Sequence, residues 1–75
     1  MTAQQYNTLK AHKHIYDFFL RVQTVNTAHP SIGAINEVMR EMGQPMDLSC
    51  SKCVAAGLPS IYEQYFKYES EHGIN

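Results

Sequence analysis

Residues 49–73, SCSKCVAAGLPSIYEQYFKYESEHG, decide the fold of this 75-residue chain. Apolar and aromatic side chains recur along them at the 3.6-residue spacing of an α-helix. Ser49 is a typical N-cap, and Gly73 is a typical residue at a helix end. The apolar phase continues through Gly57-Leu58-Pro59, but a proline inside a helix removes a backbone hydrogen bond. Because residues 60–63 could form a capping box and restart a helix, we expect this helix to be kinked or broken near its proline.

The residues before this stretch predict two further helices. Thr2 and Gln5 form a capping-box pattern, and without glycine or proline the first helix can run to about Thr24. Ser31 can cap a second helix, from Ile32 to about Met42, that stops at Gly43. The inner arc predicted for the first helix consists of Tyr6, Leu9, Ile15, Tyr16, Phe19, Leu20 and Val22. His12 also falls inside this arc, and Phe18 lies at its far edge.

No stretch alternates between apolar and polar residues as a strand would. The sequence therefore predicts an all-α fold, a small three-helix bundle with short connections that forms a single domain over residues 1–75. A core of this size is only marginally stabilising, and such chains often depend on a metal, a disulfide or a partner subunit.

Composition narrows the classes of function. The net charge of −1 argues against nucleic-acid binding, which needs a basic face. No apolar run is long enough to span a membrane, and the N-terminus lacks the pattern of a secretory signal. We therefore expect an intracellular protein in a reducing environment, where a stable structural disulfide is uncommon.

Cys50 and Cys53 are the only residues suited to soft-metal or redox chemistry, and three interpretations of them remain open. The favoured one treats both as buried core residues, since they continue the predicted inner arc of Val54, Gly57, Ile61, Tyr65, Tyr68 and His72. The second is a zinc site, for which the pair supplies two of four ligands; His12, or a second copy of the chain, would complete it. The third is thiol redox chemistry, since a helix N-terminus and Lys52 would both stabilise a thiolate.

Catalysis is not expected, because no nucleophile–base pair, phosphate-binding loop or inward carboxylate pair can be argued. The aromatic residues suggest a different role. Phe18 on the first helix and Tyr62 and Phe66 on the third flank the core arcs, where a small bundle need not cover them. Since aromatic residues are enriched in the cores of interfaces, these three are the candidate contact residues for a protein partner or for self-association.

Several short motifs resemble small helical proteins of tailed bacteriophages that contain Cys-x-x-Cys and are mostly of unassigned function. These motifs are His29-Pro30-Ser31, Met42-Gly43, Leu48-Ser49-Cys50-Ser51-Lys52-Cys53, Ile61-Tyr62 and Tyr65-Phe66. The resemblance covers about the last two thirds of the chain, and Gly57-Leu58-Pro59 departs from the uninterrupted helix that it implies. It implies a phage accessory protein in the host cytoplasm or the virion, with a head-associated structural role as one candidate, and it transfers no catalytic residue.

The sequence thus predicts a non-enzymatic structural or accessory protein that acts through protein–protein contacts in a larger assembly. The alternative is a small metal- or thiol-dependent regulator that binds a host or viral protein through the Cys50/Cys53 region. No cofactor is required by the first hypothesis, and zinc is the candidate metal for the second.

Overall fold

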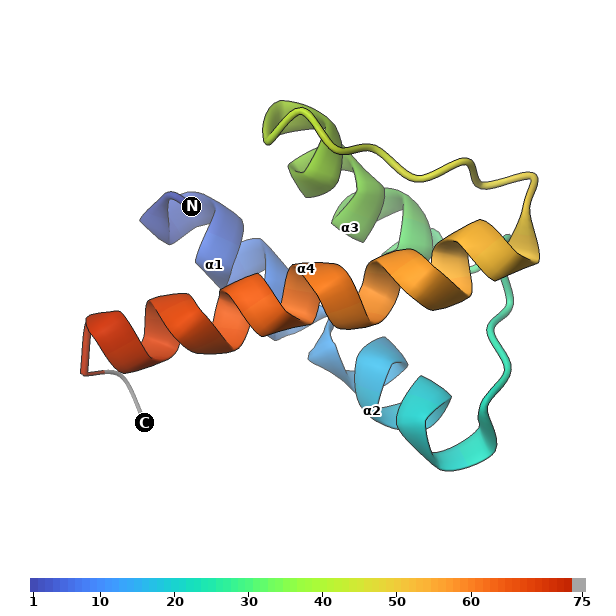
Figure 1. Cartoon of the computed structure of the whole chain (residues 1–75), viewed down its shortest axis with the longest axis horizontal. Coiled ribbons are helices and arrows are strands. Elements are labelled where there is room, and N and C mark those ends of the chain that lie inside the picture. Colours follow the sequence, from blue (N-terminus) through green and yellow to red (C-terminus); the bar gives the residue numbers. More distant parts are fainter. Residues whose placement is uncertain (74–75) are drawn as a thin grey trace.

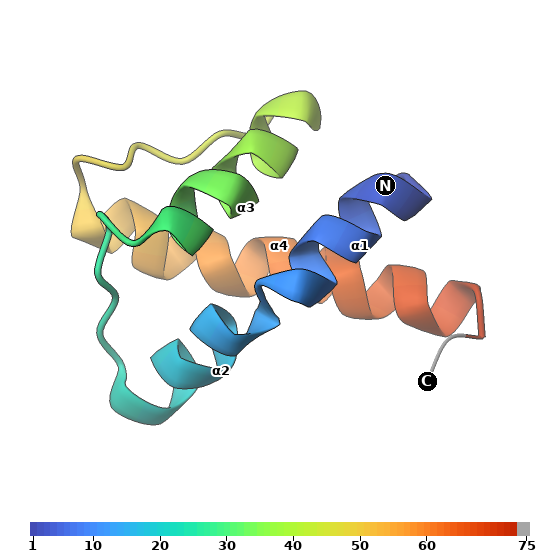
Figure 2. The ribbon, with the colours of Figure 1, turned by 180° about the vertical axis from the view of Figure 1, so that it is seen from behind.

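Four α-helices make up the fold in the computed structural model, which describes residues 1–73. They are α1 (Ala3–Ala11), α2 (Lys13–Val22), α3 (Pro30–Glu41) and α4 (Ser51–Glu71). Figure 1 shows α4 running along the whole length of the molecule. In the reverse view of Figure 2, α1, α2 and α3 all lie in front of it. The all-α prediction is confirmed for the described residues, and the three shorter helices form one layer against α4.

The predicted first helix is two helices, which corrects the three-helix architecture. The capping box of Thr2 and Gln5 forms as expected, but α1 ends and α2 begins at His12, whose φ is −108° and ψ is 11°. At this break the carbonyl of Leu9 accepts the amide of His12 at 3.3 Å and the hydroxyl of Tyr62 at 2.7 Å. A donor from α4 therefore occupies a carbonyl at the end of α1, and the chain turns there.

The start of α3 is fixed by two histidines, where the sequence predicted a cap from Ser31. His29 is the N-cap, and its Nδ1 accepts the amide of Ser31 at 3.1 Å. The Ser31 hydroxyl is buried and lies 2.9 Å from His12 Nδ1. Pro30 occupies the first turn, where its missing N–H costs nothing. Gly43 follows the helix with φ of +77°, which confirms the predicted stop, since that conformation favours glycine.

A buried amide holds the linker between α3 and α4. The Asn36 side chain accepts the Met46 amide at 2.6 Å and donates to the Met46 carbonyl at 3.3 Å. The Met46 side chain then packs against Gly57 of α4, where an added Cβ would lie 2.6 Å from Met46 Sδ. Glycine is therefore required inside this helix for close approach, which offsets its low helix propensity.

The helix α4 runs unbroken from Ser51 to Glu71 with Pro59 inside it. Of the two predicted alternatives, a kinked or a broken helix, the break is therefore wrong. A proline in a helix interior costs about 3 kcal/mol. Burial on both sides of Pro59 outweighs that cost, because the buried residues keep one helical phase throughout. These residues are Val54, Leu58, Ile61, Tyr62 and Tyr65.

The buried apolar residues form a single cluster that takes members from all four helices and from the linker. Aromatic rings dominate its centre. The ring of Tyr6 stacks between those of Tyr65 and Tyr68, at 4.8 and 5.1 Å between centroids. The ring of Tyr62 stacks on that of Tyr16 at 4.6 Å. The aromatic part of the core thus lies where α1 and α2 meet the second half of α4, and α3 adds Ile32, Ile35, Val38 and Met39.

Replacing Asn36 by alanine should lower the free energy of unfolding by about 2–3 kcal/mol, because it leaves two buried backbone groups of Met46 without their partner. Urea denaturation followed by circular dichroism measures this change. Asn7→Ala, at an exposed position of α1, is the matched control and should change stability by no more than about 0.5 kcal/mol. Equal effects of the two substitutions would contradict the role given to Asn36.

Candidate functional site

The two cysteines lie at the N-terminus of α4 and are bonded to each other through their sulfurs. Cys50 is the N-cap, and its Sγ accepts the amide of Cys53 at 3.1 Å. Cys50 is half-buried and Cys53 is exposed. The favoured prediction, that both are inward core residues, is therefore wrong. The prediction fails because of the phase of α4. The buried arc of this helix includes Leu58 and Tyr62, and Cys53 lies outside that arc.

The segment before the pair is held by an Asx turn. The Asp47 carboxylate accepts the Ser49 hydroxyl at 2.6 Å and the Ser49 amide at 3.0 Å. These bonds, from the hydroxyl first and then from the amide, lower the pKa of the Asp47 carboxyl. Ser49 thus belongs to the turn, and the helix cap that was predicted for it is Cys50.

His12, the predicted third metal ligand, is not brought to the cysteines. Its Nδ1 is engaged with Ser31 at the start of α3, at the break between α1 and α2. Within residues 1–73 no three side chains of the metal-binding types gather around a common point. A zinc site at the cysteine pair would therefore need ligands from another molecule, such as a second copy of the chain.

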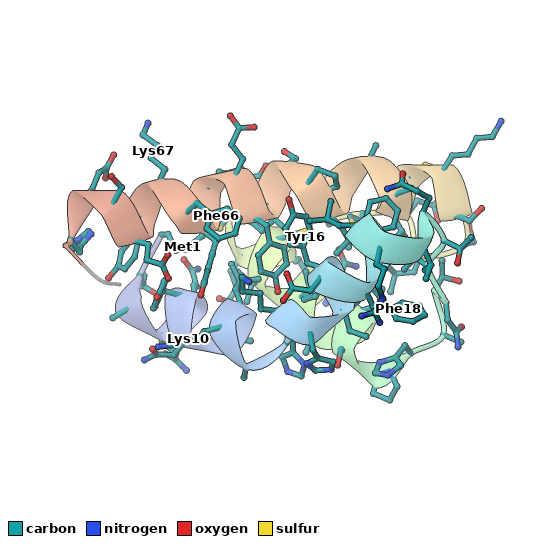
Figure 3. The ribbon with its side chains drawn as sticks, turned by 90° about the horizontal axis from the view of Figure 1, so that it is seen from below. Met1, Lys10, Tyr16, Phe18, Phe66 and Lys67 are labelled. Carbon is teal, nitrogen blue, oxygen red and sulfur yellow. A yellow bond between two sulfur atoms is a disulfide. The ribbon has the colours of Figure 1, made fainter. Side chains whose placement is uncertain are left out.

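The three candidate contact residues divide into two groups. Tyr62 is fully buried, so its predicted place on a contact surface is wrong; its hydroxyl and ring are used inside the fold. Phe18 and Phe66 are 47% and 40% exposed, and Figure 3 shows both on the face seen from below. Their role as contact residues stays a prediction.

Sequence reasoning missed two further exposed apolar residues, Leu20 and Val22, which it placed on the inner arc. They are 49% and 40% exposed. The helical wheel assumed one continuous helix from residue 3, and the break at His12 changes the phase of everything after it. Phe19 is the one buried residue of α2. No signal in the sequence marks this break, because the residues around it contain neither glycine nor proline.

Cations lie beside both exposed rings. The guanidinium of Arg21 is 5.5 Å from the ring centroid of Phe18, and Lys13 Nζ is 5.7 Å from that of Phe66. Phe18 also lines a hollow of about 390 Å³ between α2 and the loop that follows it. Its wall includes Ile15, Val25, His14 and His29 as well as Arg21. Lys13 also pairs with Asp17 Oδ1 at 3.2 Å, so the border of the exposed rings carries a carboxylate as well as the two cations.

A partly buried hydrogen bond joins α1 to the last turns of α4. The Tyr6 hydroxyl donates to Glu69 Oε2 at 2.6 Å. This bond to a carboxylate, followed by burial, raises the pKa of the Tyr6 hydroxyl. Burial is the main cause that raises the pKa values of Tyr62 and Tyr65.

No family model matches the chain, and searches of curated proteins and of solved structures found no match either. Function must therefore be argued from the geometry. A helix with the length and hydropathy of a membrane span does not occur within residues 1–73.

The raised tyrosine pKa values predict loss of stability at alkaline pH. An unfolded tyrosine ionises near pH 10, whereas Tyr6, Tyr62 and Tyr65 keep their protons to higher pH in the fold. Their stabilising effect is therefore complete below about pH 10 and is lost as the pH rises above it.

Tyrosinate absorbance and far-UV circular dichroism, recorded together during an alkaline titration, measure this coupling. The late-ionising tyrosines should titrate with the loss of helix, and Tyr62→Phe should have one fewer of them. Ionisation of all tyrosines near pH 10 with the helical signal intact would show that the prediction is wrong.

Proposed function

We propose that this protein acts through protein–protein contact made by exposed apolar side chains, together called the apolar surface: Phe18 and Val22 on one side of α2, Leu20 on the opposite side, and Phe66 of α4. The observation that carries the proposal is the exposure of these four side chains, between 40% and 49% each. Isolated exposed apolar residues are common on soluble proteins. Three within the ten residues of α2 are a concentration that water solvates poorly and a partner can cover.

The composition of this apolar surface supports a contact role. Aromatic and arginine side chains are enriched among the residues that contribute most to binding, and here Phe18 lies beside Arg21. Phe66 packs against the ring of Tyr16, at 6.2 Å between centroids. A ring supported on one side and open on the other loses little freedom on binding, so less of the binding free energy is lost to ordering.

The cation beside Phe18 favours a partner with acidic groups. Arg21 flanks this ring, whereas Lys13 beside Phe66 is paired with Asp17 at 3.2 Å. A second copy of the chain fits this requirement, because the second half of its α4 carries Glu63, Glu69 and Glu71 against a single lysine. Complementary charge of this kind orients partners and speeds association.

The phage resemblance adds a narrower proposal, that the assembly is a tailed-phage particle and that the protein is a virion or head-associated subunit. The runner-up, a metal-dependent regulator, requires ligands beyond His12, since that side chain is bonded to Ser31. The thiol-dependent form of the runner-up rests instead on the bond between the sulfurs of Cys50 and Cys53.

Analytical ultracentrifugation over a range of concentrations tests the contact proposal. The wild type should self-associate, and Leu20→Glu/Phe66→Glu should weaken association by about 30-fold or more, since loss of one well-buried contact residue alone costs about 2 kcal/mol. The control Gln4→Glu/Asn7→Glu adds the same charge at two exposed polar positions of α1 and should associate as the wild type does.

Helix content and thermal midpoint of both double variants would be recorded to confirm that each is folded. A wild type that stays monomeric and recovers no bound protein in a pull-down would contradict the proposal. Equal weakening in the control would assign the effect to net charge and would also contradict it.

A further inference from the structure

We propose that Cys50 and Cys53 form a thiol–disulfide exchange site, in which Cys53 receives the incoming sulfur of a cysteinyl thiol and Cys50 leaves as the thiolate. This activity goes beyond the contact function and is independent of the apolar surface on α2 and α4. Three observations carry it: the two sulfurs are bonded, their surroundings differ, and the bond connects no distant parts of the fold.

The bond does not act as a structural staple. It joins two residues of the same first turn of α4, which the helix already holds together through the hydrogen bonds from Cys53 and Val54 to the Cys50 carbonyl. A disulfide stabilises mainly by closing a long loop of the unfolded chain, and this one closes a loop with only two intervening residues. Opening it leaves the packing of α4 on the other helices unchanged.

The two sulfurs are in different environments. Cys53 is exposed and forms part of the wall of a hollow of about 480 Å³ between α4 and the linker, beside Met46 and Gly57. A thiolate can therefore reach Cys53 Sγ from solvent. Cys50 is half-buried and is not part of that wall. Access thus selects Cys53 as the sulfur that is attacked.

The leaving group is selected by the helix terminus. Cys50 Sγ already accepts the Cys53 amide at 3.1 Å, and it sits at the N-cap, where the positive end of the helix dipole stabilises a negative charge. Lys52, exposed between the two cysteines, adds a positive charge nearby. Asp47 is the acidic residue of the linker; its carboxylate accepts hydrogen bonds from Ser49, and Asp47 lines the same hollow as Cys53. Exchange is faster when the leaving thiolate is the more stable one.

The reaction balances in two steps. A thiolate forms a new S–S bond to Cys53 and breaks the bond between Cys53 and Cys50, which leaves Cys50 as a thiolate. A second thiolate attacks the sulfur of the first and releases Cys53, also as a thiolate. Two external thiols are oxidised to one disulfide, the protein disulfide is reduced to two thiols, and the protons of the external thiols pass to solvent or to the released cysteines. The reverse sequence re-forms the bond at the expense of an external disulfide.

Thiolate absorbance against pH, measured on reduced single-cysteine variants, tests the difference between the two sulfurs. Cys53→Ser retains Cys50 and the backbone amide that bonds it, and Cys50→Ser retains Cys53, so each variant is the control for the other. The pKa of Cys50 should be lower than that of Cys53 by about one pH unit or more. Equal values, or the opposite order, would overturn the assignment of Cys50 as the leaving group.

Exchange itself is measured on the whole wild-type chain with reduced and oxidised glutathione as the probe. The pair should convert fully between dithiol and intramolecular disulfide as the ratio of the two is varied, and an acid-quenched intermediate should carry glutathione on Cys53. A pair that never forms the intramolecular bond, or an adduct located on Cys50, would overturn the proposal. Unchanged helical circular dichroism across the titration is expected, and unfolding on reduction would overturn the claim that the bond is not a staple.

Discussion

The hydrogen bond from the Tyr62 hydroxyl to the Leu9 carbonyl, at 2.7 Å, is the interaction on which the arrangement of the helices depends. It connects the middle of α4 to the end of α1, while the ring of the same tyrosine stacks on Tyr16 of α2. One fully buried side chain therefore contacts the helices on both sides of the break at His12. A buried hydroxyl without a partner would cost about 1–3 kcal/mol, so the carbonyl at the end of α1 and the hydroxyl satisfy each other. The break also sets the direction of α2 and, with it, the side chains that α2 leaves in solvent.

Both candidate functional regions follow from how α4 is held. Its central position brings Phe66 beside Tyr16 and Lys13 of α2, where the Phe66 side chain stays 40% exposed. At its other end, the hydrogen bonds of the Asn36 side chain to the Met46 backbone fix the linker. The Met46 side chain packs against Gly57 and holds that linker along the first turns of α4. The cysteine pair is thereby placed at the helix terminus with one sulfur open to solvent. The contact surface and the sulfur site are separate, and neither requires the other.

The all-α class and most helix boundaries were predictable, because caps, glycine stops and apolar periodicity are local signals. The capping box at Thr2 and the stop at Gly43 are such cases. The break at His12 was not predictable, since it arises from the Tyr62 hydroxyl, a donor 53 residues from its acceptor Leu9 along the chain. As a consequence, Leu20 and Val22 were assigned to the core. The apolar phase through Pro59 was recognised but left a kink or a break open, because the burial of Leu58 and Tyr62 that outweighs the proline's cost depends on tertiary packing. For the candidate site, spacing located the cysteines but placed them inward, whereas their exposure depends on the tertiary phase of α4. Phe18 and Phe66 were identified as exposed aromatics and Tyr62 was not, because its partner is a backbone carbonyl that no sequence pattern reveals.

Nuclear magnetic resonance of the wild-type chain shows whether Tyr62 meets α1 and α2 at a break between them. This arrangement predicts helical Cα chemical shifts for residues 3–11 and 13–22, interrupted at His12, together with nuclear Overhauser contacts from the Tyr62 ring to Leu9 and to the Tyr16 ring. Uninterrupted helical shifts through residue 12, with the Tyr62 ring in contact with neither, would contradict it.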